Sequence, residues 1–162
     1  MKKFIPGLEL SEVFFNHALQ PIMEEKFPQV EYSAARLDYG SDVLGFDTPM
    51  SMDHGWGPKL TLYLSEENNK AYHSQIDDYL ANHLPFDILG FPTNFAEPYS
   101  DGGVMQHKES YPIHHMITIT TLEEWFSDYL GVDLKRPLSP KIWMTITQQR
   151  LATLREGRIF YD

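Results

Sequence analysis

The residues best suited to chemistry lie between positions 37 and 64, in the segment LDYGSDVLGFDTPMSMDHGWGPKLTLYL. Gly40 and Ser41 follow a predicted strand, and a Gly–Ser turn in that place can present backbone N–H groups and a hydroxyl to a phosphate. Glycine lets the phosphate approach the backbone closely. The segment therefore indicates a phosphate-binding turn at Gly40 and Ser41, with an ordinary strand-to-loop turn as the alternative.

The second half of the segment supplies a carboxylate, an ammonium group and an indole ring. Asp53, at the edge of the next predicted strand, is the candidate catalytic carboxylate and metal ligand, since Mg²⁺ favours one or two carboxylates together with substrate phosphates. Lys59 is a candidate phosphate ligand, with a surface lysine as the alternative. Trp56 is a candidate cleft residue that could stack on a base, although a core tryptophan is the commoner outcome. Asp42 and Asp47 are expected to form turns and to be solvated.

The segments that must position these residues alternate between helical and extended patterns. Apolar residues recur at helical spacing in three segments: 8–27, which Pro21 interrupts, 66–84 and 147–156. Strand patterns occupy four others: 32–37, 59–64, 87–91 and 113–120. Thr121 and Glu124 have the spacing of a capping box, which begins a further helix that Gly131 ends.

The order of these segments predicts the fold class. Helices and strands alternate without an internal repeat, which predicts an α/β (α+β) fold with a mixed sheet flanked by helices. In strand 113–120, Thr118 and Thr120 share one face and are candidate cleft residues, with ordinary cross-strand pairing as the alternative. We expect a single domain over residues 1–162.

Composition and charge exclude several classes of function. The 162 residues include 23 acidic and 13 basic side chains, a formal net charge of −10, and no cysteine. Disulfides, zinc–thiolate sites, iron–sulfur clusters and a cysteine nucleophile are therefore excluded. The acidic balance disfavours nucleic acid and anionic membranes as partners, because clustered Lys and Arg bind both. No apolar run approaches the ~20 residues of a membrane span, and no signal-peptide pattern opens the chain, so we expect a cytoplasmic protein.

Other catalytic and metal motifs are weak or absent. His114 and His115 are adjacent in a predicted strand, so their side chains are expected on opposite faces. Catalytic zinc usually takes three protein ligands, and we expect these histidines and His107 to be structural or exposed. No Gly-x-Ser-x-Gly elbow or Walker-type phosphate loop occurs, which argues against a serine hydrolase and a P-loop NTPase.

The spacing of the Gly–Ser turn and Asp53 resembles the signature of the nucleotidyltransferase fold, the DNA polymerase beta superfamily. In that signature Gly–Ser is followed, after a gap of about this length, by Asp-x-(Asp/Glu). The longer string GSDVLGFDTPMSMDHGWGP, with YSAARLDYG before it, resembles the bacterial family known as domain of unknown function 4037. FIPGLELSEVFF, ITITTLEEWFSDYLG and PLSPKIWMTITQQRLATLREGRIF are also similar to that family, so the resemblance covers nearly the whole chain.

The resemblance implies a nucleoside triphosphate partner and a Mg²⁺ cofactor. Members typically continue into a helical C-terminal part, so the resemblance also implies a domain truncated near residue 162, in which residues 121–156 begin that part. The acceptor of an active member would be an unknown hydroxyl, with RNA the least attractive acceptor for so acidic a chain. The sequence does not predict an oligomeric state.

One departure from the family pattern bears directly on activity. Where the family commonly has Asp-His-Asp-Trp-Gly-Pro, this chain has Gly55 in place of the second aspartate. Strand 113–120 contains no Asp or Glu that could serve as a third carboxylate. We therefore expect a degenerate domain that binds nucleotide and Mg²⁺ weakly or not at all. Two alternatives stay open: an active nucleotidyltransferase that moves NMP from NTP to a hydroxyl, and a non-catalytic structural or interaction domain of a larger protein.

Overall fold

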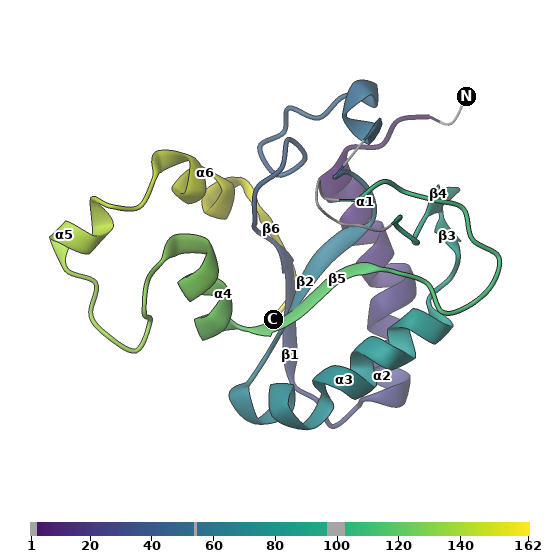
Figure 1. The fold of residues 1–162 in the computed structure, drawn as a ribbon, viewed down its shortest axis with the longest axis horizontal. Coiled ribbons are helices and arrows are strands. Elements are labelled where there is room, and N and C mark those ends of the chain that lie inside the picture. The colour runs from purple at the N-terminus through teal and green to yellow at the C-terminus, as the bar shows by residue number, and fades with distance from the viewer. Residues whose placement is uncertain (1–2, 54, 97–102) are drawn as a thin grey trace.

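Four strands form a mixed sheet at the centre of the fold. The computed structural model describes residues 3–53, 55–96 and 103–162. The strands are β1 (Tyr32–Arg36), β2 (Lys59–Leu64), β5 (Met116–Thr121) and β6 (Arg158–Tyr161). They lie in the order β5-β2-β1-β6, with β2 and β5 parallel and the other neighbours antiparallel. Helices cover both faces (Figure 1), which confirms the predicted fold class.

The N-terminal helices and α3 cover one face of the sheet (Figure 1). α1 (Gly7–Phe14), the π-helical segment η1 (Phe15–Leu19) and α2 (Gln20–Lys26) follow one another directly, and α3 spans Glu66–His83. Pro21 lies at the start of α2 and has no N–H with which to continue the helical ladder. The interruption predicted at Pro21 therefore takes the form of a wider π turn just before it.

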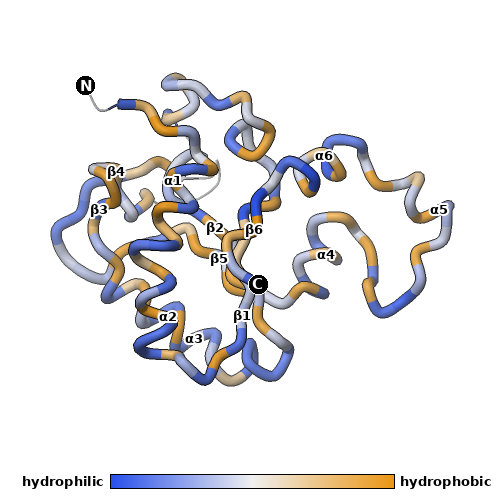
Figure 2. Tube along the Cα trace, turned by 180° about the vertical axis from the view of Figure 1, so that it is seen from behind, coloured by the Kyte–Doolittle hydropathy of each residue, from blue (hydrophilic) through white to orange (hydrophobic). Residues whose placement is uncertain are grey.

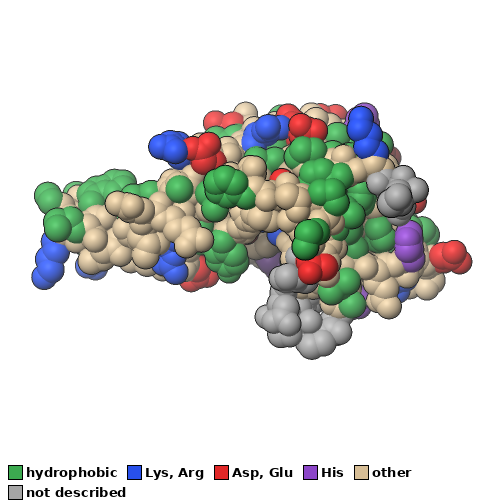
Figure 3. All heavy atoms as spheres, turned by 90° about the horizontal axis from the view of Figure 1, so that it is seen from above, with side chains coloured by type: hydrophobic (Ala, Val, Ile, Leu, Met, Phe, Trp, Pro, Cys, Tyr) green, Lys and Arg blue, Asp and Glu red, His purple; other side chains and the backbone are tan. Residues whose placement is uncertain are grey.

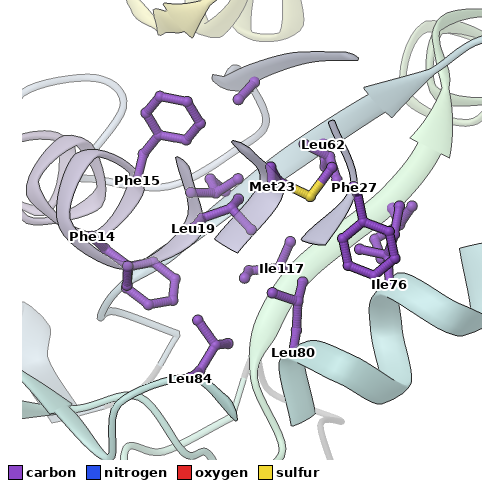
Figure 4. Close-up of a cluster of buried hydrophobic side chains, with 14 of the residues drawn as sticks. Phe14, Phe15, Leu19, Met23, Phe27, Leu62, Ile76, Leu80, Leu84 and Ile117 are labelled. Carbon is purple, nitrogen blue, oxygen red and sulfur yellow. The ribbon is translucent and has the colours of Figure 1, made fainter. Parts of the chain in front are cut away.

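The alternating leucines of β2 line the larger hydrophobic core. Leu60, Leu62 and Leu64 are buried on the face that the N-terminal helices and α3 cover. Side chains from both helical segments converge on them (Figure 4), among them Phe14, Leu19, Met23, Ile76 and Leu80. In Figure 2, α2 and α3 alternate between hydrophilic and hydrophobic stretches, as expected for helices buried on one side only. None of the helices in the described ranges is long and apolar enough to cross a bilayer.

Helices between β5 and β6 cover the opposite face of the sheet. They are α4 (Leu122–Leu130), α5 (Pro140–Trp143) and α6 (Gln148–Glu156). Thr121 and Glu124 form the predicted capping box, and α4 ends at Gly131 as predicted. Trp125 and Tyr129 of α4 pack with Tyr63 of β2 in a second core cluster. Along the chain, the helical segment 122–156 thus connects β5 to β6, two strands of the same sheet.

Two predicted strands differ from the structure. The segment 87–91 is a two-stranded hairpin, β3 (Asp87–Ile88) and β4 (Phe91–Pro92), because the chain reverses at residues 89–90. The Asp87 carboxylate accepts the Gly90 N–H at 3.0 Å and so closes this turn. The strand predicted from residue 113 begins only at Met116, since the Ile113 N–H donates to the Ala81 carbonyl of α3 instead of to a neighbouring strand.

His115, just before β5, joins that strand to α3. Its side chain is 5% exposed, and its Nε2 lies 3.5 Å from Asp77 Oδ1. The Nδ1 atom of the same ring accepts the Ile117 N–H at 3.3 Å. Burial lowers the pKa of His115 below its usual value of 6.5, against the opposing charge of Asp77, while neighbouring His114 lowers it further. The folded protein therefore favours the neutral imidazole.

We expect the stability of the protein to fall as the pH drops below about 6.5, the ordinary pKa of histidine. The unfolded chain binds a proton there that the folded chain resists, so acidification shifts the equilibrium toward the unfolded state. Urea unfolding at pH 7.5 and pH 5.0 measures the effect. A His115→Gln variant should lose less stability than the wild type between these pH values, and an equal loss in both proteins would contradict the assignment.

Candidate functional site

A buried ion pair holds the turn that contains Gly40 and Ser41. Arg36, the last residue of β1, donates to Asp42 Oδ2 at 3.0 Å and to Asp42 Oδ1 at 3.2 Å, and it also pairs with Asp38. Arg36 is 2% exposed and Asp42 is 4% exposed. A Cβ atom at Gly40 would collide with the Asp42 carboxylate, so glycine is required there for the close approach. Ser41 is exposed at the surface of this turn.

Asp42 lies in a turn as expected, but the expectation that it is solvated is wrong, and Asp47 is half-buried and held by hydrogen bonds. Asp42 is the buried partner of Arg36. Asp47 Oδ2 accepts the backbone N–H of Gly7, at the start of α1, at 2.6 Å and the indole N–H of Trp56 at 2.9 Å. Both carboxylates thereby fix the loop that follows β1 against the rest of the protein.

Trp56 belongs to the core and not to a cleft. It is 2% exposed, stacks on Phe4 with ring centroids 5.9 Å apart and meets Phe91 edge-on at 5.3 Å. This placement corrects its candidate role as a base-stacking residue, because an indole enclosed by Phe4, Phe91 and Asp47 has no free face for a ligand. His54, its neighbour in the motif, lies outside the described residues.

Asp53 lies at the end of a helical turn and not on a strand edge. It closes the 3₁₀ helix η2 (Pro49–Asp53), is exposed, and precedes β2 by five residues. Among the described residues, no three His, Asp or Glu side chains lie together as a group that could hold a metal ion. One exposed carboxylate suits a Mg²⁺ ion that arrives on a nucleotide, since phosphate oxygens and water would have to complete its six-coordinate shell.

Gly55 has a backbone conformation that suits glycine. Its φ is 61°, in the left-handed region, and its N–H donates to the Gly103 carbonyl at 2.8 Å. A residue with a side chain adopts this φ at a cost, which is smallest for Asn and Asp. Gly55 therefore fits the local turn and supplies no carboxylate there.

Lys59, the first residue of β2, has a largely buried ammonium group. Its Nζ donates to the Gly55 carbonyl, and it has no carboxylate within ion-pair distance among the described residues. Burial lowers the pKa of Lys59 to about 8, and the nearby charge of Arg36 lowers it further while Asp42 opposes the effect. Lys59 thus lies close to the ion pair beneath the Gly40–Ser41 turn, and a ligand anion would supply the charge partner that it lacks.

Thr118 and Thr120 line a cavity on the same side of the sheet as Lys59. The register pairs Thr61 with Thr118 and Tyr63 with Thr120, so these side chains share the face that α4 covers. The cavity has a volume of about 250 Å³. Its other lining residues are Asp38, Tyr39, Trp125, Asp128, Tyr129 and Arg150. It therefore adjoins the Gly40–Ser41 turn through residues 38 and 39.

Three of the eight residues that line this cavity are aromatic. Tyr129 stacks on Trp125 with ring centroids 4.8 Å apart and lies 5.7 Å from the ring of Tyr39. The Arg150 guanidinium lies 5.7 Å from the centre of the Tyr129 ring, within cation–π range. Trp125 and Tyr129 are 8% and 6% exposed, whereas Tyr39 is 70% exposed. The Tyr39 ring and the Arg150 guanidinium are therefore the groups best suited to contact a planar, electron-rich group such as a nucleobase. The spacing of Trp125 and Tyr129 predicts a core helix, and no sequence signal placed their edges in a cavity.

The histidines do not converge on one site. His107 and His114 line a separate cavity of about 350 Å³ beside Asn94, whereas His115 is buried against α3. Adjacent residues His114 and His115 therefore have different environments, although neither lies in a strand as predicted, because β5 begins at Met116.

Comparisons with known proteins add no further identification: no family model, curated protein or solved structure matches the chain. The resemblance to the domain of unknown function 4037 family therefore stays a prediction from the quoted segments.

Proposed function

We propose that this chain is a nucleotidyltransferase-like domain that binds a nucleoside triphosphate without transferring its nucleotidyl group. One observation carries the proposal: Gly55 has a φ of 61° and no carboxylate, and the resemblance to the domain of unknown function 4037 family implies a second metal-binding carboxylate at this position. Two-metal phosphoryl transfer needs carboxylates that hold both ions at once, and Asp53 alone cannot do this. Nucleotide binding does not require two metal ions, because N–H donors and cations are enough to hold the phosphates.

The residues around the turn supply those donors. In the proposed complex, the exposed Ser41 hydroxyl and the neighbouring backbone face the phosphates, and Lys59 neutralises part of their charge. The aromatic cavity beyond Tyr39 receives the base, with Thr118 and Thr120 as hydrogen-bonding groups on its floor. Asp53 contributes one ligand to a Mg²⁺ ion that the triphosphate brings.

A thermal-shift titration tests the proposal. ATP, GTP, CTP and UTP are added separately with Mg²⁺, and stabilisation grows as RT ln(1 + [L]/Kd), about 2.7 kcal/mol at a hundredfold excess over Kd. We expect a shift with at least one nucleotide, which Ser41→Ala reduces. Ser74→Ala, an exposed serine on α3, should leave the shift unchanged. No shift with any nucleotide would refute binding and favour a structural or interaction domain.

Gly55→Asp should restore the family pattern at a modest structural cost. The left-handed φ predicts a loss of roughly 1 kcal/mol in the free energy of unfolding. Gly55→Asn has the same shape and backbone cost but no charge, so it is the matched control. We expect Mg²⁺ to strengthen nucleotide binding more in Gly55→Asp than in Gly55→Asn, as isothermal titration would measure.

A separate activity assay distinguishes the degenerate domain from the active alternative. Pyrophosphate release is measured with each nucleotide and a mixture of hydroxyl acceptors. We expect none from the wild type. Release by the wild type, lost in Asp53→Ala, would show that the protein is an active transferase and that Gly55 does not disable it.

A further inference from the structure

Positive charge is concentrated in one part of this acidic protein. Residues 134–155 contain five Lys or Arg residues and no Asp or Glu, so the rest of the chain has 8 basic and 23 acidic residues. This stretch contains α5 and all of α6 except its last residue, Glu156, which pairs with Arg155. α5 lies at the end of the projection that extends away from the sheet (Figure 1). The charge of the projection is therefore opposite to that of the body.

Large apolar side chains are exposed on the same projection. Ile142 is 37% exposed, Trp143 is 50% exposed and Met144 is 86% exposed. Figure 3 shows hydrophobic side chains gathered at this end of the molecule. We call Arg136, Lys141, Ile142, Trp143 and Met144 the α5 surface. Three consecutive exposed apolar residues that directly follow a lysine are typical of a contact site and not of scattered surface residues.

We propose that the α5 surface docks an acidic amphipathic helix of a protein partner. The apolar stripe of such a helix would cover Ile142, Trp143 and Met144, and its flanking carboxylates would meet Lys141 and Arg136. Arg136 is 83% exposed, and its i,i+3 pair with Asp133 is a surface pair of little energetic weight, so the guanidinium can exchange partners. Opposite charges at the rim provide specificity and speed association, while the apolar anchors provide affinity.

Charge disfavours the other occupants of this surface. A second copy docked through the same surface would bring Lys141 and Arg136 against their own counterparts, and like charges across an interface are costly. A membrane or nucleic acid presents an extended anionic surface, which would repel the remaining body with its 23 acids and 8 bases. A single short acidic helix meets the α5 surface without approaching that body.

A display selection with the full chain tests this inference. The library holds 18-residue sequences with leucines fixed at helical spacing and every other position free to be Glu, Asp, Lys, Arg or Gln. We expect the peptides recovered by the selection to be enriched in Glu and Asp. Trp143 reports binding of the selected peptides directly, because Trp56 and Trp125 are only 2% and 8% exposed and Trp143 is the third of the three tryptophans. Its emission should shift to the blue as the peptide covers it.

Two pairs of variants locate the contact. Met144→Ser should weaken peptide binding about tenfold, and Met50→Ser is its control, because Met50 is 85% exposed at a different site. Lys141→Glu should weaken binding by a similar factor and reduce its salt dependence, whereas Lys70→Glu on α3 should not. Both test positions are exposed, so these variants are expected to fold with unchanged melting temperatures.

Three results would overturn the inference. Recovery of no binder, or of a pool that is not acidic, excludes the proposed partner. Binding to vesicles with phosphatidylserine that is lost in Met144→Ser would identify an anionic membrane as the occupant instead. Concentration-dependent association in sedimentation, lost in the same variant, would identify a second copy. None of these results depends on whether the protein binds nucleotide.

Discussion

Replacing Asp42 by alanine is expected to lower the free energy of unfolding by about 3 kcal/mol or more. Asp42 and Arg36 are both almost fully buried and are joined by two hydrogen bonds. Alanine would leave the guanidinium in the protein interior with Asp38 as its remaining carboxylate. Removing one partner of a buried pair is costly because the other charge loses its compensation without regaining water. Urea unfolding followed by circular dichroism measures the loss.

Two further variants distinguish the effect of breaking the ion pair from a general effect of removing a carboxylate. Asp78→Ala, on the exposed side of α3, should change stability by no more than about 0.5 kcal/mol. The double variant Arg36→Met with Asp42→Leu should recover most of the lost stability, since it leaves no buried charge unpaired. A loss below about 1 kcal/mol in Asp42→Ala would mean that Asp38 alone satisfies Arg36.

The effect extends to the candidate site because the ion pair supports the turn from below. Gly40 lies directly against the Asp42 carboxylate and the Arg36 guanidinium. Without Asp42 the Gly40–Ser41 turn loses the contact that fixes its path. If the proposed function is correct, Asp42→Ala should also weaken nucleotide binding at temperatures where the variant is still folded.

The elements with strong local signals were predictable from the sequence. The alternation of KLTLYL specifies β2 to the residue, and the Thr121–Glu124 pair specifies the start of α4. In both cases the information lies within one segment, where periodicity or a cap directly reflects the backbone conformation. The same holds for α3, whose predicted and observed boundaries differ by a single residue.

The roles of Asp42, Asp47 and Trp56 were not predictable, because each depends on a partner from another segment. Asp47 accepts hydrogen bonds from Gly7, 40 residues earlier, and from Trp56. A turn signal describes the backbone of an aspartate but not whether its carboxylate reaches water. One usable signal was present: Arg36 ends a strand whose preceding two residues are alanines, and a charge there requires a buried partner.

The positions of the candidate residues were predictable only in part, for the same reason. The charges of Arg36 and Asp42 act on Lys59, and the same two side chains lie against Gly40. The 3₁₀ turn at residues 49–53 removes Asp53 from the strand edge on which the prediction placed it. The difference arises within the five residues of η2. This short segment has neither an apolar alternation nor a capping residue that would predict a 3₁₀ turn from the sequence.

Replacing Lys59 by methionine is expected to stabilise the protein and to impair nucleotide binding at the same time. A pKa of about 8, against the ordinary 10.5, corresponds to a penalty of roughly 3 kcal/mol for holding the charged form in the folded state. Methionine fills similar space without a charge, although it loses the hydrogen bond to the Gly55 carbonyl. We therefore expect a net gain of about 1–3 kcal/mol at pH 7 in chemical unfolding.

The pH dependence of this gain identifies its cause. Below pH 8 the lysine is charged in both states of the wild type, so the full penalty is present. Between pH 8 and 10.5 the folded protein releases the proton while the unfolded chain keeps it, so the wild type gains stability as the pH rises. The advantage of Lys59→Met should shrink across that window. Lys70→Met, at an exposed position, should give no such trend.

Nucleotide binding should change in the opposite direction to stability. A bound phosphate would pair with the Lys59 ammonium and raise its pKa, so wild-type affinity should fall as the pH rises through about 8. The Lys59→Met variant should bind more weakly at pH 7 and show no comparable fall. A variant that is more stable and binds nucleotide as tightly as the wild type would limit Lys59 to a structural role. A buried cation that has no ion-pair partner among the described residues is costly to keep, and a ligand phosphate is the charge partner that would explain why Lys59 is present.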